Sequence, residues 1–446
     1  MDKNFLFDIV HKLKKKGCDE ADVFFVKNFS MSSSRRLRQL EKNEQSESIE
    51  IGIRGIIGKK QSIISTNNFE LKNINNLIDK LYEMITLVPD NEFCGLAEKN
   101  IISSFTKEDY KKLDLFDKKV PSLDELLNKA AQLEDSALDN KLITNSEGAE
   151  VAWSRSDYFL IASNGMFQEF SKTSSSYILA ILAGEKENME REYDYKSEVY
   201  FDELNNLEKV GKETAKKAIS KLNSRKIKTC KTNVIYDSRV SSSLLNNLIS
   251  ASNASLIARG TSYLNDKLGK RLFNNTINII DDPLIPKKMR SKIVDCEGIK
   301  CKKKKIIDSG QLKYFINTLE QSRQLKFKPT GNAVRGVSST PYASPSNLFL
   351  ENGKISKKEM MQDLKEGLLV TELMGSSINM SNGDYSRGAS GFWIENGEIS
   401  YPVSEVTIAG NLLDIFSTLK PANDLKLKFS INAPSCMVEN LTIAGI

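Results

Sequence analysis

The sequence predicts an α+β fold with an N-terminal α/β layered domain, a central α+β segment and a β-rich C-terminal domain with antiparallel sheets. Three observations support this fold class. Helix-like and strand-like periods alternate near the start, a polar stretch bounded by two prolines follows, and short strands and turns dominate the second half. We expect domains at 1–100, 101–225 and 226–446, and 446 residues are enough for two or three domains.

The N-terminal part is expected to be a compact layer of helices and sheet. Apolar residues at helical spacing predict a helix over 4–16, which Gly17 ends, and a second helix over 71–88. Ile49, Ile51 and Ile53 alternate with polar or small residues, which is the two-residue period of a strand. The predicted strands are 21–29, 34–45 and 48–57.

The central part again mixes helix and strand. Residues 89–121 are polar and lysine-rich, and we expect them to connect two domains. Helices are predicted over 123–138 and 201–220, and Asn164-Gly165 predicts a tight turn. The strands expected between these helices are 151–156, 158–162 and 171–183.

The C-terminal part is expected to hold one long helix, over 241–259, among short strands that begin at 232–236. Asn396-Gly397 supplies the two left-handed backbone positions of a tight hairpin. The strands expected around this turn are 391–395 and 398–402, followed by 405–409. Thr-Ile-Ala-Gly occurs at 407–410 and again at 442–445, which indicates either equivalent strands of a pseudo-symmetric sheet or a chance recurrence.

Three C-terminal segments combine glycines with polar residues in an unusual order. They are RGTSYLNDKLGKRLF at 259–273, VDCEGIKCKKKKIIDSGQLKYFI at 294–316, and GDYSRGASGFW from Gly383, with YPVSE shortly after it. With these segments and its Ile-Ala-Gly ending, the chain resembles the TldE (PmbA) branch of the TldD/TldE family over essentially its whole length. That family was once described as modulators of DNA gyrase, and the resemblance implies a cytosolic metalloprotease system that degrades unfolded or fragmented peptides.

The resemblance also indicates which catalytic groups are missing. In the TldD branch a helix carries His-Glu-x-x-x-His, and a cysteine near the C-terminus completes a zinc site. The resemblance places Asn246 and Asn247 at the first two motif positions and Ala251 at the last, and none of them supplies an imidazole or a carboxylate. The whole chain has one histidine, His11. We therefore expect no catalytic residue and no metal or other cofactor in this chain, with zinc in a TldD-like partner.

The six cysteines give no better metal site. None of them forms a Cys-x-x-Cys pair, which is the common spacing of structural zinc ligands. Cys436 lies roughly where the resemblance places the cysteine ligand of the TldD branch. It is either a relic of that ligand or a thiol that packs like a small apolar side chain.

Composition limits the partners that the chain can have. The net charge of +6 is mild for this length, so we expect no nucleic-acid partner. The lysines at 302–305 could contact phosphate, although a solvated strand edge or hairpin arm explains them better. We expect no membrane partner, because no run of eighteen apolar residues occurs, and the start has no features of a secretory signal. Few, irregularly placed cysteines predict a cytoplasmic protein with free thiols.

The resemblance implies a supporting subunit that forms a heterodimer with a TldD-like zinc subunit and supplies an interface and one wall of a peptide channel. Asp384, Tyr385, Ser386 and Arg387 are the candidates to reach the channel or the subunit boundary, although Asp384 and Arg387 could simply fix a tight loop. Glu405 is a weaker candidate, since a buried carboxylate paired with an arginine such as Arg335 or Arg387 would serve folding alone. The alternative is a stand-alone homodimeric peptide-binding module without proteolytic activity.

Overall fold

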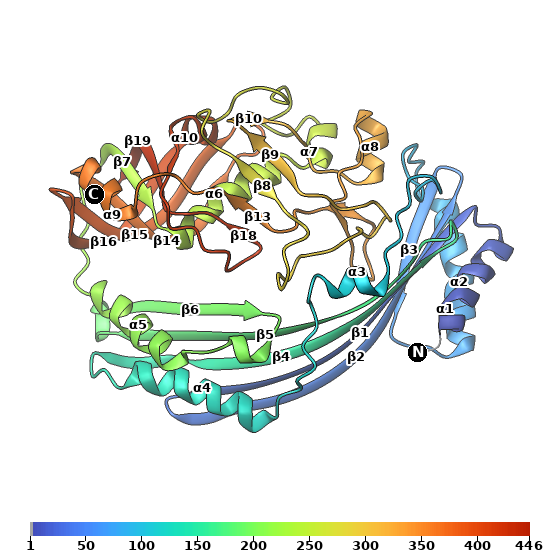
Figure 1. The fold of residues 1–446 in the computed structure, drawn as a ribbon, viewed down its shortest axis with the longest axis horizontal. Helices are drawn as coiled ribbons and strands as arrows, with labels where there is room; N and C mark the ends of the chain where they lie inside the picture. The colour runs from blue at the N-terminus through green and yellow to red at the C-terminus, as the bar shows by residue number, and fades with distance from the viewer. Residues whose placement is uncertain (1–2) are drawn as a thin grey trace.

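A computed structural model describes residues 3–446 and confirms the mixed α+β fold class with antiparallel sheets. Figure 1 shows a long curved sheet beneath the C-terminal domain, with α1 and α2 at one end of the sheet and α4 and α5 at the other. The sheet has the order β3-β2-β1-β4-β5-β6, so strands from the N-terminal and central parts share it. No helix of residues 3–446 is long and apolar enough to cross a membrane.

The N-terminal half of this sheet is a long hairpin covered by two amphipathic helices. Helix α1 (Lys3–Lys16) and helix α2 (Leu71–Leu87) bury the apolar faces that their spacing predicts. They pack on β1 (Glu20–Arg36) and β2 (Gln39–Ile57) in one apolar cluster. A strand that sequence analysis missed, β3 (Lys60–Thr66), pairs with β2 and forms the edge of the sheet.

The turn between β1 and β2 lies at Leu37 and Arg38, inside a segment predicted to be a continuous strand. Both residues have positive φ, 50° and 66°, although neither is a typical turn residue. The fully buried Glu134 of α4 stabilises the turn, because its carboxylate accepts the backbone N–H of Leu37 at 2.9 Å and that of Arg38 at 3.0 Å. The prediction failed because the stabilising group comes from about a hundred residues along the chain.

The central half of the sheet is formed by long strands. The expected strands 151–156 and 158–162 are one strand, β4 (Ile143–Ala162), which pairs with β1 on one side and with β5 (Phe167–Ala183) on the other. Pairing on both sides keeps the polar middle of β4 in the sheet. The edge strand β6 (Glu190–Glu198) was not predicted.

Two helices cover the central strands. Helix α4 (Leu123–Leu138) begins at a capping box between Ser122 and Glu125. The predicted helix 201–220 is a short 3₁₀ turn, η2 (Phe201–Glu203), followed by α5 (Leu207–Ser220). At Gly211 the two helices approach so closely that a Cβ would lie 2.1 Å from Ser136 Oγ, so only glycine fits there. The remaining elements before the C-terminal domain are α3 (Lys107–Lys111) and η1 (Lys186–Asn188).

The C-terminal domain is built around a closed ring of strands in the order β16-β15-β14-β7-β19, which the pairing of β16 with β19 completes. These strands are β7 (Cys230–Tyr236), β14 (Gly367–Ile378), β15 (Asp384–Glu395), β16 (Glu398–Asn411) and β19 (Cys436–Ala444), and β17 (Lys420–Pro421) adds to β19. The predicted Asn396-Gly397 turn joins β15 to β16, with φ values of 52° and 81°.

The repeated Thr-Ile-Ala-Gly segments lie side by side and close this ring. Ile408 of β16 pairs with Ile443 of β19 in an antiparallel register, so the two copies face each other. Glu405 and Asn440, each two residues before the threonine of its copy, both have positive φ, 55° and 58°. The repeat is therefore a local two-fold feature of the ring.

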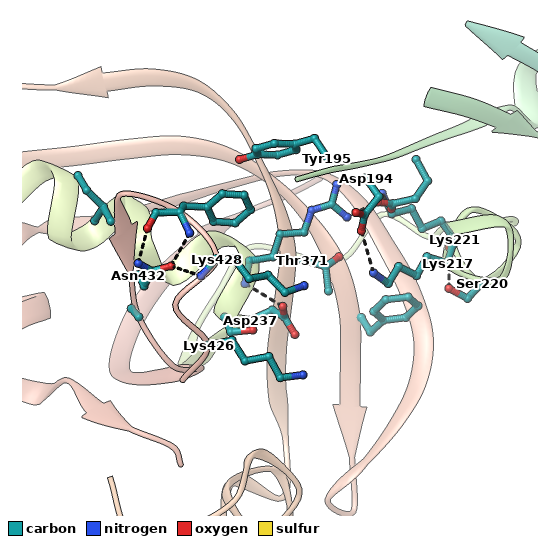
Figure 2. A pocket seen from close by; sticks show the side chains of 17 residues that line it. Asp194, Tyr195, Lys217, Ser220, Lys221, Asp237, Thr371, Lys426, Lys428 and Asn432 are labelled. Atoms are coloured by element: carbon teal, nitrogen blue, oxygen red, sulfur yellow. Dashed lines mark hydrogen bonds and ion pairs between the residues drawn. The ribbon is translucent and has the colours of Figure 1, made fainter. Parts of the chain in front are cut away.

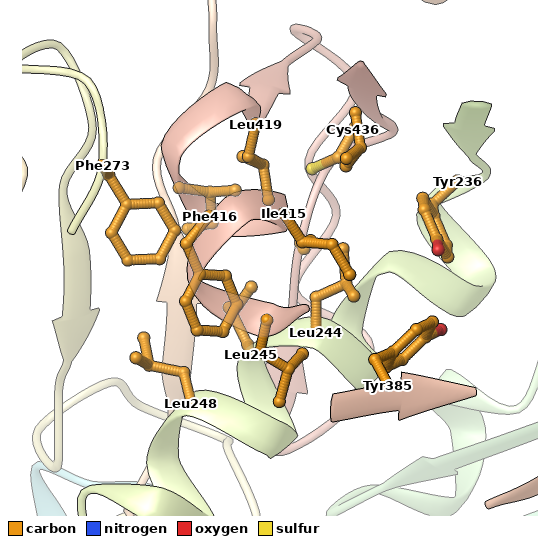
Figure 3. Close-up of a cluster of buried hydrophobic side chains, with 14 of the residues drawn as sticks. Tyr236, Leu244, Leu245, Leu248, Phe273, Tyr385, Ile415, Phe416, Leu419 and Cys436 are labelled. Carbon is orange, nitrogen blue, oxygen red and sulfur yellow. The ribbon is translucent and has the colours of Figure 1, made fainter. Parts of the chain in front are cut away.

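The predicted helix 241–259 is interrupted. Helix α6 (Ser238–Ala251) ends at Ala251, and Asn253 caps a separate short helix, α7 (Ala254–Ala258), by accepting the N–H of Ser255. The apolar side of α6 packs into the largest core of the molecule, together with residues of the ring and of α10 (Leu412–Thr418), as Figure 3 shows.

A second, smaller sheet has the order β10-β9-β8-β13-β18 and lies next to a two-stranded ribbon. Part of the lysine run is a strand, because Lys304 and Lys305 begin β9. Lys303 forms an ion pair with Asp282, and Lys304 forms one with Asp281. The remaining elements are β8 (Ile279–Asp281), β9 (Lys304–Asp308), β10 (Gln311–Leu312), β13 (Leu348–Leu350), β18 (Ile431–Asn432), β11 (Ala333–Val334), β12 (Tyr342–Ala343), α8 (Leu319–Leu325) and α9 (Lys357–Leu364).

A buried ion cluster, here called the latch, joins the long sheet to the C-terminal domain. Asp22 of β1 accepts hydrogen bonds from Arg54 of β2 and from Arg335, which follows β11. All three side chains are buried, and only Asp22 carries a negative charge. Beside the latch, a Cβ on Gly52 would lie 1.8 Å from the carbonyl oxygen of Val337, so the two parts meet backbone to backbone.

Candidate functional site

Helix α6 presents the residues that stand at the predicted motif positions. Asn246 is exposed, Asn247 is 5% exposed and Ala251 is fully buried. These side chains do not fit a zinc ion, because an amide is a poor zinc ligand and the Ala251 methyl group has no donor atom. Among residues 3–446, no group of three or more His, Cys, Asp or Glu side chains is placed to hold a metal.

Cys436 begins β19 and lies inside the apolar core. Figure 3 shows it beside Ile415 and Leu419 of the neighbouring segment. Its Sγ donates to the carbonyl oxygen of Pro434 at 3.2 Å, and burial raises the pKa of the thiol well above its usual value. The thiol is therefore held protonated, in the packing of a small apolar side chain.

The segment from Gly383 to Arg387 forms the start of β15. Asp384 is exposed and accepts hydrogen bonds from Asn382 Nδ2 at 2.7 Å and from Asn411 Nδ2 at 3.4 Å. These bonds fix the turn before β15, which is the role that the alternative interpretation gave to Asp384. Tyr385 is only 2% exposed, whereas Ser386 and Arg387 are half-buried.

An open cavity of about 640 Å³ lies at this segment, between the end of β14 and the start of β15. Three of the four predicted channel residues, at 384–386, line it, whereas Arg387 does not. Sequence analysis missed the other side of the cavity, which is formed by Ser377, Ile378, Asn379 and Met380. The signal available was the run of serines and asparagines before Gly383, which is typical of a turn at a strand end.

Tyr263 connects this segment with α6. Its backbone N–H donates to the carbonyl oxygen of Met380 at 2.7 Å, and its hydroxyl donates to the carbonyl oxygen of Asn247 at 3.5 Å. The helix that carries the altered motif and the cavity beside β15 are therefore neighbours, although more than 130 positions separate Asn247 from Met380 in the sequence.

Several buried polar atoms on these same elements have no hydrogen-bond partner among the described residues. They are Ser243 Oγ, Asn247 Nδ2 and Arg387 Nε. Figure 3 shows Tyr236 of β7 and Tyr385 of β15 with their hydroxyls turned toward one another. Burial raises the pKa of both tyrosines, so both hydroxyls stay protonated. The groups here can form hydrogen bonds, but none of them is a general base.

The folding alternative for Glu405, a buried carboxylate paired with an arginine, is wrong, whereas its place at the channel or the interface stays a prediction. Its side chain is 65% exposed and pairs with Lys226 at 2.6 Å, so it is neither buried nor bonded to an arginine. Arg335 belongs to the latch instead. The positive φ of Glu405 places it at the bend of β16, and this bend turns the side chain out into solvent.

A second cavity, of about 230 Å³, lies between β6, α5 and the C-terminal domain (Figure 2). Most of its charged side chains are paired. Lys221 contacts Glu192 at 2.7 Å and Glu372 at 2.8 Å, and Lys357 contacts Asp237 at 2.6 Å. This network joins the central part to the C-terminal domain and has no exposed carboxylate free to activate water.

Comparison with known proteins identifies the family. Three domains described for the PmbA/TldA metallopeptidases match in sequence order: domain 1 at 21–85, the central domain at 114–222 and the C-terminal domain at 229–445. The chain is 32% identical to the metalloprotease PmbA of Escherichia coli O157:H7, over 96% of this chain and 92% of that protein. The chain belongs to the PmbA/TldD metallopeptidase family.

Solved structures of the family share the whole fold. A proposed modulator of DNA gyrase from Bacteroides thetaiotaomicron superposes with a TM-score of 0.91 at 25% identity, over 100% of this chain and 99% of that one. TldE from Thermococcus kodakarensis superposes with a TM-score of 0.86 at 21% identity, over 99% and 100% of the two chains. The arrangement of long sheet, covering helices and C-terminal ring is therefore that of PmbA/TldD family members.

Proposed function

We propose that this protein is the TldE/PmbA-like subunit of a cytosolic TldD/TldE metalloprotease and that it does not itself hold the zinc ion. One observation carries the proposal: α6 presents two amides and a methyl group at the positions where a zinc peptidase needs two imidazoles and a carboxylate. The single histidine of the chain, His11, lies on α1 in the other half of the molecule, as Figure 1 shows for the two helices. In the assembly a TldD-like partner brings the zinc, which activates water for attack on a peptide carbonyl.

The contribution of this chain is a wall of the peptide channel beside β15. Unfolded or fragmented peptides are extended, and an extended backbone is held through hydrogen bonds to strand ends and polar side chains. The cavity at 377–386 and the nearby unpartnered hydroxyl of Ser243 and amide of Asn247 supply such groups. Met374 of β14, which is 46% exposed, adds an apolar surface next to them that suits a subunit interface.

The deciding experiment measures bound zinc and cleavage of an unstructured peptide. Three samples are compared: the purified chain alone, the chain with a TldD-like subunit, and the chain with a variant of that subunit. In the variant, alanine replaces the first histidine of the zinc motif. Zinc and cleavage that appear only with the intact partner support the proposal. Zinc-dependent cleavage by this chain alone would mean that Asn246, Asn247 and Ala251 do not mark a lost site.

A stand-alone homodimeric peptide-binding module is the second candidate, because the polar groups that line the open cavity beside β15 could hold an extended peptide in either assembly. Light scattering of the chain with and without the TldD-like subunit separates the two functions. A heterodimer that forms at the expense of self-association favours the supporting subunit. Self-association that persists in the presence of the partner favours the binding module.

A further inference from the structure

A third cavity, of about 200 Å³, lies where three parts of the chain meet, and it shares no residue with the cavity beside β15. Its walls come from β1, the connecting segment before α4, strands β4 and β5, and the C-terminal domain. Five aromatic side chains line it: Phe24, Phe105, Tyr110, Tyr158 and Phe170. Neighbouring rings in this row have centroids 4.8–6.1 Å apart, so they form one continuous apolar surface.

The charged side chains that line this cavity are all cationic: Lys172, Lys292 and Arg335. Lys172 Nζ donates only to the carbonyl oxygens of Ser291 at 3.1 Å and Met289 at 3.4 Å, and no carboxylate of the described residues lies within 4 Å. Burial lowers the pKa of Lys172 to about 8, and the charge of Lys292 adds to this effect. The lining therefore contains no carboxylate that pairs with Lys172.

The remaining groups around the cavity favour an anionic ligand. Arg335 Nη1 binds Asp22 of the latch, but Arg335 Nη2 has no acceptor among residues 3–446, although the side chain is buried. Tyr110 Oη is also buried without a partner. The nearby Asp295 attracts Lys292, but it lies outside the lining, and its carboxylate accepts three backbone N–H groups, from Glu297, Ile299 and Ala333. A buried donor without an acceptor is costly, which favours a ligand that supplies one.

We propose that this cavity binds the carboxylate of an aromatic or branched apolar acid whose amine is absent or acylated, as in the C-terminal residue of a peptide. The aromatic row accommodates the apolar body, and the three cations and the tyrosine hydroxyl accommodate the carboxylate. The lining has no carboxylate to pair with a free ammonium group, which disfavours an unmodified amino acid. A volume of about 200 Å³ is below the ~300 Å³ of most ligand pockets, so the site has room for about one residue.

This inference rests on the geometry of the single chain and is independent of the proposed role in a protease. Titration calorimetry on the full chain compares N-acetyl-L-phenylalanine with its C-terminal amide, with N-acetyl-L-alanine and with free L-phenylalanine. The acid with the aromatic side chain should bind at least tenfold more tightly than each of the other three. Equal affinity for the acid and the amide, or no binding of the acid at millimolar concentration, would overturn the proposal.

Two further ligands distinguish the sources of this chemistry. Ala-Ala-Phe presents the carboxylate on a peptide, whereas phenylacetate presents it on a free acid. Tighter binding of the tripeptide than of phenylacetate assigns a peptide C-terminus. Binding of phenylacetate alone keeps the carboxylate site and assigns a small aromatic acid.

Variants locate the site within the chain. Lys172→Met should remove the preference for N-acetyl-L-phenylalanine over its amide, because it removes the central cation but keeps the length of the side chain. Phe105→Ala should weaken both ligands by a similar factor, because it removes only part of the apolar surface, and the side chain is only half-buried. Lys216→Met, at an exposed lysine of α5, is the control and should leave both affinities unchanged. If Lys172→Met fails to fold, Phe105→Ala decides alone. Weaker binding of both ligands with the preference for the acid over the amide retained supports the site, whereas unchanged affinities for both ligands contradict it.

Discussion

Replacing Asp22 by asparagine tests whether the latch holds the long sheet and the C-terminal domain together. Asp22 is 1% exposed and is the common partner of two buried guanidinium groups. Asp22→Asn keeps the shape but removes the only negative charge, which leaves Arg54 and Arg335 buried beside each other. Breaking a buried ion pair by removing one partner costs about 3–5 kcal/mol, which is at least about a fifth of the ~5–15 kcal/mol that stabilises a typical domain.

Urea unfolding, followed by circular dichroism and by tryptophan fluorescence, measures this loss. Asp79→Asn is the matched control, because its ion pair with Lys16 is exposed on both sides and such pairs are worth about 0–1 kcal/mol. A loss for Asp22→Asn no larger than that of the control would refute the argument. The combined variant D22L/R54M/R335M sharpens the test, because an apolar replacement of the whole latch removes the unpaired charges and should recover most of the stability.

Three further predictions follow from groups described above. Burial alone would raise the pKa of Asp22, but the charges of Arg335 and Arg54 outweigh burial and hold this pKa below its usual value. The stability that Asp22 contributes should therefore be complete above about pH 4 and be lost as the pH falls through the lowered pKa of the folded state. Acid unfolding should show a steeper loss of stability for the unmodified protein than for Asp22→Asn. Glu134→Ala should destabilise the protein by about 2 kcal/mol, because two backbone N–H groups of the β1–β2 turn lose their buried acceptor, and thermal unfolding that matches an exposed Glu150→Ala control would contradict this role. Ala251→His should cost about 1–3 kcal/mol by overpacking the core, whereas Asn246→His on the exposed side of the same helix should change the urea midpoint little; similar midpoints would mean that α6 can accept the second motif histidine.

Local patterns were sufficient to predict the elements whose stability is local. The helices α1, α2 and α4 have a clear apolar period, and the Asn396-Gly397 turn needs only its own two residues. The β1–β2 turn could not be found in this way, because its stability depends on Glu134 of a later helix. The break predicted within β4 was wrong for a similar reason, since strands on both sides hold the polar middle of β4 in the sheet.

The candidate site was predictable in chemistry but not in geometry. The sequence and the resemblance were enough to predict that the motif positions hold Asn246, Asn247 and Ala251. They could not predict that Tyr385 is buried against Tyr236 or that Glu405 points into solvent, because both outcomes depend on how the ring of strands closes. The latch joins residues more than three hundred positions apart, so no local pattern could indicate it.

The sharing of one sheet by the N-terminal and central parts limits how the chain can be divided. Strand β1 pairs with β4 from Asp22 to Arg35. Among residues 3–446, this is the only strand pairing that joins the N-terminal half of the long sheet to its central half. A fragment that ends near residue 100 would expose this whole length of β1 as an unpaired edge, which is a ready template for aggregation. Fragments intended for separate study should therefore keep residues 1–225 together, and an exchange of segments between relatives should place its junctions beyond α5.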